Sequence, residues 1–95
     1  MNLTLQMAQQ ILTSMHDDFD AMNFIRAYQE ICPNGYAADM ATYREQDNPV
    51  KILHQQIGRF LENNKDALNI VQEPNKKKVI NTIGFETEVA LWHKL

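Results

Sequence analysis

The sequence predicts an α+β fold that is mainly α, with four helices followed by a C-terminal β-hairpin. Apolar residues recur at three- and four-residue steps up to about residue 63, which is the period of helices with one buried face. After Asn63-Asn64, apolar and polar residues alternate as they do in strands. The 95 residues, 44% hydrophobic and 22% charged, suit a single domain spanning residues 1–95.

Two helices are expected in the first third of the chain. The first covers residues 4–15, where five apolar residues share one face: Leu5, Ala8, Ile11, Leu12 and Met15. The second begins after a capping aspartate, either Asp18 or Asp20, and runs to about Ile31. Its expected buried residues are Phe24, Ile25, Tyr28 and Ile31.

A turn and a short third helix are expected next. Pro33 disfavours helical geometry at the residue before it, and the Asn34-Gly35 pair tolerates the positive φ of a tight turn. The third helix is expected over residues 36–45, and residues 46–48 form a turn into the fourth.

The fourth helix, residues 49–63, is the most informative stretch of the chain. Asn48 is placed to cap it and Pro49 to occupy its first turn. One face is expected to be buried: Val50, Leu53, Ile57, Phe60 and Leu61. The opposite face carries long hydrogen-bonding side chains around a bare backbone position: Lys51, His54, Gln55, Gly58, Arg59 and Glu62. Such a face suits the reading of base edges in DNA, or is an ordinary solvated surface.

A hairpin is expected at the C-terminal end. Its strands would cover residues 67–72 and 77–83, with a basic reverse turn at residues 73–76. The segment from Phe85 to Leu95 suits either a strand or a final helical turn, and a strand through Trp92 is favoured.

Charge and cysteine content limit the classes of function. The net charge of −3 argues against a protein that coats nucleic acid indiscriminately. The average conceals a division, because residues 1–50 carry a net charge of −5 and residues 51–95 a net charge of +2. Cys32 is the only cysteine, which excludes an intramolecular disulfide and fits a reducing compartment. With no signal peptide and no membrane-spanning run in the sequence, a cytoplasmic location without membrane contact is expected.

No motif indicates catalysis, a cofactor or a metal. The acidic cluster at residues 17–20 beside His16 lacks the spacing of calcium or zinc sites, and capping and solvation explain it. Cys32 has no flanking motif of a nucleophile, and the three glycines stand alone, without a phosphate loop. We therefore expect a non-enzymatic protein.

The order of elements resembles the winged-helix branch of the helix-turn-helix superfamily. The resemblance rests on the short helix at residues 36–45, the turn at 46–48, the helix at 49–63 and the hairpin around residues 74–76. It covers roughly residues 20–92 and is architectural, without a diagnostic motif, so residues 1–19 form an additional N-terminal helix and turn. The resemblance implies that the fourth helix takes the recognition position and that Lys76, Lys77 and Lys78 lie on the wing.

The expected function is therefore that of a small DNA-binding regulatory domain. In this interpretation Lys65, Lys76, Lys77 and Lys78 neutralise phosphates, while Lys51, His54, Gln55 and Arg59 face the bases. So small a site implies a homodimer, for which the helix from Thr4 to Met15 is the expected interface. Two alternatives stay open: the fold serves as a protein-interaction module without nucleic acid, and the three lysines simply protect a sheet edge from aggregation.

Overall fold

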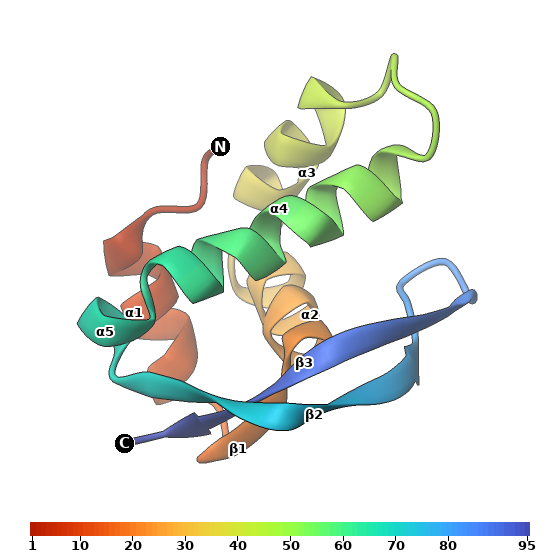
Figure 1. The fold of residues 1–95 in the computed structure, drawn as a ribbon. Coiled ribbons are helices and arrows are strands. Elements are labelled where there is room, and N and C mark those ends of the chain that lie inside the picture. Colours follow the sequence, from red (N-terminus) through yellow and green to blue (C-terminus); the bar gives the residue numbers. More distant parts are fainter.

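Five helices and three strands make up the fold, which a computed structural model describes for all residues 1–95 (Figure 1). In chain order they are α1 (Leu5–Thr13), β1 (Asp18–Asp20), α2 (Ala21–Ile31), α3 (Pro33–Thr42), α4 (Pro49–Asn63), α5 (Lys65–Leu68), β2 (Ile70–Ile80) and β3 (Glu86–Lys94). About half of the chain is helical. The α+β class and a C-terminal hairpin are confirmed.

The strands form one antiparallel sheet in the order β1-β3-β2. Trp92 of the central strand lies opposite Phe19 on one side and Gln72 on the other. The helices lie above the sheet in Figure 1, with α4 crossing over β2 and β3 and α2 behind it. The helix α4 and the β2-β3 hairpin therefore face each other.

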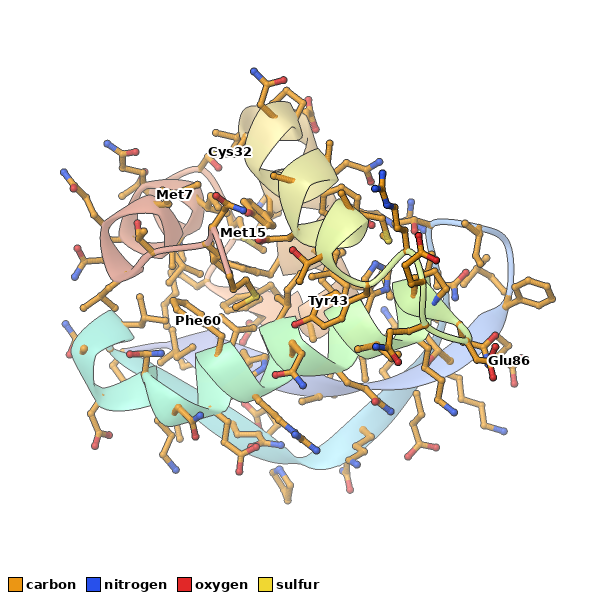
Figure 2. The ribbon with its side chains drawn as sticks, turned by 90° about the horizontal axis from the view of Figure 1, so that it is seen from above. Met7, Met15, Cys32, Tyr43, Phe60 and Glu86 are labelled. Atoms are coloured by element: carbon orange, nitrogen blue, oxygen red, sulfur yellow. The ribbon has the colours of Figure 1, made fainter.

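The buried apolar side chains form one cluster of 17 residues, to which both helices and sheet contribute. Leu53, Ile57 and Leu61 of α4 are fully buried, which confirms the centre of the predicted stripe, whereas Val50 and Phe60 are only half-buried. Figure 2 shows Phe60 on the side of α4 that faces α1. No helix combines the length and the apolar character needed to cross a membrane.

The first two helices both begin after a capping side chain, which for α2 is one of the two aspartates predicted. The hydroxyl of Thr4 accepts a hydrogen bond from the Met7 amide at the start of α1. Asp20 caps α2 through a reciprocal pair of hydrogen bonds with Asn23, at 2.7 and 2.9 Å. Local side-chain chemistry therefore determines both starting points.

The apolar face of α1 is buried in the common core. Ala8 and Ile11 have no exposed surface and Leu12 is 6% exposed. The outer face of the helix is polar, with Gln6, Gln9 and Gln10 exposed. The dimer contact through Thr4 to Met15 stays a prediction, and it would have to use this polar face.

The segment around Asp18 differs from the sequence prediction. It was expected to be a turn, but Asp18–Asp20 pairs with β3 as an edge strand. A strand of three residues has no visible alternation, and its partner lies more than 70 residues further along the chain. Nothing in the local sequence therefore indicates it.

The predicted turn at Asn34-Gly35 is also wrong, because α3 begins at Pro33, directly after α2. Proline needs no amide partner in a first helical turn, so it starts the new helix here as well as ending the old one. Gly35 lies inside α3, where an added Cβ would come within 3.0 Å of the Tyr28 hydroxyl oxygen. Gly35 therefore allows α3 to approach α2 closely. Because α3 ends at Thr42, its connection to α4 is longer than the three residues predicted.

The position of the hairpin turn is the largest correction. Residues 73–75 form a bulge inside β2, and the turn lies instead between Ile80 and Glu86, with Gly84 at φ 89°. Residues 65–68 form the short helix α5, ended by Asn69 at φ 54°, where a strand was expected from residue 67. The Glu73-Pro74-Asn75 sequence is typical of a turn, but pairing of the residues on both sides with β3 turns it into a bulge. The strand favoured for residues 85–95 is confirmed as β3.

Candidate binding groove

A groove of about 970 Å³ lies between α4 and the β2-β3 hairpin. The apolar residues that line it include Met22 and Ile25 of α2 and Val89, Ala90 and Trp92 of β3. The polar wall is α4, and Figure 2 shows Glu86 near the first turn of that helix, at the hairpin end of the groove. The groove therefore has an apolar floor and polar sides. Binding sites for polypeptides and for organic ligands have the same arrangement.

The predicted outer face of α4 is the wall of this groove. Lys51, Gln55, Gly58, Arg59 and Glu62 all line it. The structure therefore brings three predicted site residues, Lys51, Gln55 and Arg59, to one concave surface. The helical period alone was sufficient to predict that they lie together.

His54 also lines the groove, but it has an internal role. Its Nε2 lies 3.0 Å from the Tyr36 hydroxyl oxygen, in a half-buried position between α3 and α4. Burial, with a smaller contribution from the Arg26 charge, lowers the pKa of His54 to about 4. His54 is therefore neutral at pH 7 and supplies no positive charge for a phosphate.

The three lysines at residues 76–78 are not on a wing tip. They lie in the middle of β2, which is an edge strand, and successive side chains point to opposite faces. Lys76 lines the groove, Lys77 places its ammonium 3.8 Å from the Asp20 carboxylate, and Lys78 lies 4.0 Å from Glu86. The sheet therefore divides the basic cluster that the sequence predicted, and the edge-protection alternative fits this position.

Lys65 is separate from these residues. It lies in α5 at the far end of α4, is exposed, and does not line the groove. Of the eight predicted site residues, the groove collects Lys51, His54, Gln55, Arg59 and Lys76.

The charges of the groove are balanced. Three basic side chains line it, Lys51, Arg59 and Lys76, and so do three acidic ones, Glu62, Glu86 and Glu88. Of these six, only Glu86 takes part in an ion pair within the chain. The groove therefore has no excess of positive charge of the kind that DNA-binding surfaces carry.

Gly58 leaves an open stretch of helix backbone in the groove wall. An added Cβ would have no heavy atom within 4 Å, so packing inside the chain does not require glycine there. Glycine in a helix costs about 0.5–1 kcal/mol of stability relative to alanine. The glycine leaves the α4 backbone accessible from the groove at this position.

Trp92, which lines both this groove and a smaller hollow at β1, has an unused hydrogen-bond donor. The residue is 2% exposed, and its Nε1 is the only buried side-chain nitrogen or oxygen without a hydrogen-bond partner. An unpaired buried donor costs on the order of 1–3 kcal/mol.

The end of the hairpin carries exposed apolar side chains beside the groove. Ile80, Ile83 and Phe85 are 54%, 56% and 67% exposed, and the last two line the groove at its end. Sequence reasoning missed these residues because it placed the turn at residues 73–76, whereas the chain turns between Ile80 and Glu86. Of the floor residues from α2, Ile25 was predicted only as a core residue and Met22 was not singled out, since the helical period does not show which buried residues border a groove.

A second, smaller hollow of about 380 Å³ lies at the β1 side of the sheet and contains Asp18, Asp20 and Lys77. Nearby, Nδ1 of His93 lies 2.6 Å from a carboxylate oxygen of Asp18, and this hydrogen bond raises the pKa of His93. No three His, Cys, Asp or Glu side chains lie close enough together to hold a metal ion. The larger groove is therefore the candidate site.

Comparison of this chain with family models, with curated proteins and with solved structures gives no match.

Proposed function

We propose that this domain is a protein-interaction module that binds a polypeptide segment in the groove between α4 and the β2-β3 hairpin. The observation that carries the proposal is the combination of an apolar floor with charge-balanced walls. Protein interfaces have this composition, with an apolar centre surrounded by polar groups. The open backbone at Gly58 supports the same conclusion, because it leaves room for another chain against α4.

A DNA-binding role through the same face is the second candidate. It is supported by the presence of Lys51, Gln55, Arg59 and Lys76 in one groove, beside a hairpin, as in the winged-helix architecture that the sequence resembles. It is weakened by Glu62, Glu86 and Glu88 in the same groove and by the net charge of −3. The connection from α3 to α4 is also longer than the tight turn of about 3–4 residues in DNA-binding helix-turn-helix units.

Selection from a random peptide library, followed by NMR of the labelled protein, tests the first candidate. We expect selected peptides to shift the amide signals of Lys51, Gln55, Gly58 and Arg59, and the Gly58→Phe variant to lose binding. Phenylalanine at residue 58 fills the groove from a position where its Cβ meets no atom. Gln9→Phe, on the exposed face of α1, is the matched control and should bind as the wild type does.

The same labelled protein distinguishes the second candidate. Titration with mixed-sequence duplex DNA should leave the spectrum unchanged if the groove binds polypeptide. A DNA reader that makes three phosphate contacts would instead show shifts at its base-facing residues Lys51 and Arg59 and at its phosphate-facing residue Lys76. Its affinity would fall on the order of 40-fold between about 50 and about 200 mM salt. That result, together with peptides that bind elsewhere or not at all, would contradict the protein-interaction proposal.

A further inference from the structure

We propose that the polypeptide bound in the groove is the hairpin tip of a second copy of this chain, residues 80–85. Two copies would then form a symmetric dimer in which each tip lies in the groove of the partner. The inference rests on the proposed function, because it names the segment that the groove receives.

The first argument is the chemistry of the tip. Ile80, Ile83 and Phe85 are each more than half exposed, within six residues of one another. Hairpin turns that face only water are usually rich in glycine, asparagine and serine. Asn81 and Gly84 fit this composition, but Ile80, Ile83 and Phe85 add exposed apolar surface that another surface can cover.

The second argument is that the tip is held in one conformation. The Asn81 side-chain oxygen accepts hydrogen bonds from the Ile83 amide at 3.0 Å and from the Phe85 amide at 2.9 Å. The Arg26 guanidinium donates to the backbone oxygens of Ile80 and Asn81, at 2.8 and 3.3 Å, and so fastens the hairpin to α2. A preorganised tip loses little conformational entropy on binding, which favours its insertion into a preformed groove.

The third argument is the self-complementary charge of the groove. A two-fold axis places the same surface on both sides of an interface, so a surface of one sign would repel its copy. Three basic and three acidic side chains line this groove, which allows Lys51 or Arg59 of one copy to lie near an acidic side chain of the other. A surface built for a polyanion would not have this balance.

The position of the tip also fits a reciprocal contact. Ile83, Phe85 and Glu86 border the groove at the end where α4 begins. A two-fold axis near that end would place the tip of each copy in the groove of the other copy. One contact is then made twice, as a symmetric dimer requires.

Sedimentation and light scattering over a range of concentrations test the dimer. We expect the wild type to dimerise, and we expect both the tip variant Ile83→Ser/Phe85→Ser and the groove variant Gly58→Phe to dimerise at least about tenfold more weakly. Ile31→Ser, which changes an apolar residue 48% exposed at the end of α2, should leave the dimer unchanged, as should Gln9→Phe.

Mixing the two weakened variants gives the sharpest test. The tip variant has an intact groove and the groove variant an intact tip, so the mixture should form a heterodimer through one remaining contact, visible by native mass spectrometry with one protein isotope-labelled. A misfolded variant would not recover binding on mixing. A back-to-back dimer through α1 would survive both changes, and that outcome overturns the inference.

Failure of this inference is distinguishable from failure of the proposed function. A wild type that stays monomeric up to about 1 mM, yet binds selected peptides at Gly58, overturns the dimer and leaves the interaction module intact. A chain that neither dimerises through the tip nor binds peptides in the groove contradicts both proposals.

Discussion

At the scale of single residues, the buried carboxylate of Asp39 determines how α3 attaches to the rest of the chain. Asp39 is 1% exposed and accepts hydrogen bonds from the Tyr28 hydroxyl, at 2.7 Å, and from the backbone and side chain of Asn2. Burial and the contact with Asp39 raise the pKa of Tyr28, so the hydroxyl remains a donor throughout the ordinary pH range. One carboxylate therefore joins the N-terminus, α2 and α3.

Asp39→Ala should lower the free energy of unfolding by about 2–4 kcal/mol, because it leaves the Tyr28 hydroxyl and the Asn2 donors without an acceptor. Urea denaturation followed by circular dichroism measures the change. Asn34→Ala, at an exposed position of the same helix, is the control and should stay within about 0.5 kcal/mol of the wild type. Equal stability of the two variants would show that the Asp39 hydrogen bonds contribute nothing.

At the scale of elements, alanine substitutions at two helical glycines should change the stability in opposite directions, because one glycine faces open space and the other a packed side chain. Gly58→Ala should stabilise the protein by about 0.5–1 kcal/mol, since alanine favours the helix and its Cβ meets no atom. Gly35→Ala gains the same helix propensity, but its Cβ would lie 3.0 Å from the Tyr28 hydroxyl oxygen, so it should destabilise the contact between α2 and α3. Thermal unfolding of both variants provides the comparison, and the interpretation of Gly58 fails if alanine there destabilises the fold.

At the scale of the whole molecule, the pH dependence of stability should carry the signature of His54. Its pKa in the folded chain is about 4, below the ordinary value of about 6.5 that it regains on unfolding. Between these values the unfolded chain binds the extra proton, so stability falls as the pH decreases from about 6.5 to 4. His93 acts in the other direction: its raised pKa adds stability that is complete below its ordinary pKa and is lost as the pH rises through the folded value.

Chemical denaturation at a series of pH values checks this dependence. His54→Gln should show a smaller loss of stability than the wild type between about pH 6.5 and 4, whatever its stability at neutral pH. His16→Gln, at an exposed position, should follow the wild-type curve. An NMR titration in which His54 protonates near its ordinary pKa would contradict the burial that the structure assigns to it.

Over the whole molecule, the sequence predicted features that depend on residues close together in the chain and missed features that depend on distant ones. The cap of α2, at one of the two predicted aspartates, and the centre of the buried stripe of α4 depend on residues three or four positions apart, and both are confirmed. Strand β1 and the bulge at residues 73–75 depend on pairing with β3, which no local pattern encodes. For the site, helical period placed Lys51, Gln55 and Arg59 together, but the error in the hairpin turn moved the lysines at residues 76–78 to a tip that they do not occupy.

The sequence by itself determined the α+β class, the helices α1, α2 and α4 and the polar face of α4, because repeating apolar positions act over one or two turns of chain. Only the tertiary structure decided that this face borders a groove, that His54 bonds to Tyr36 and that Lys77 and Lys78 lie near acidic side chains. Those contacts join segments that are separate in the chain, and the packing of α4 and α2 over the sheet brings them together. The apolar tip at Ile83 and Phe85 became visible for the same reason, since the register of β2 against β3 determines where the chain turns.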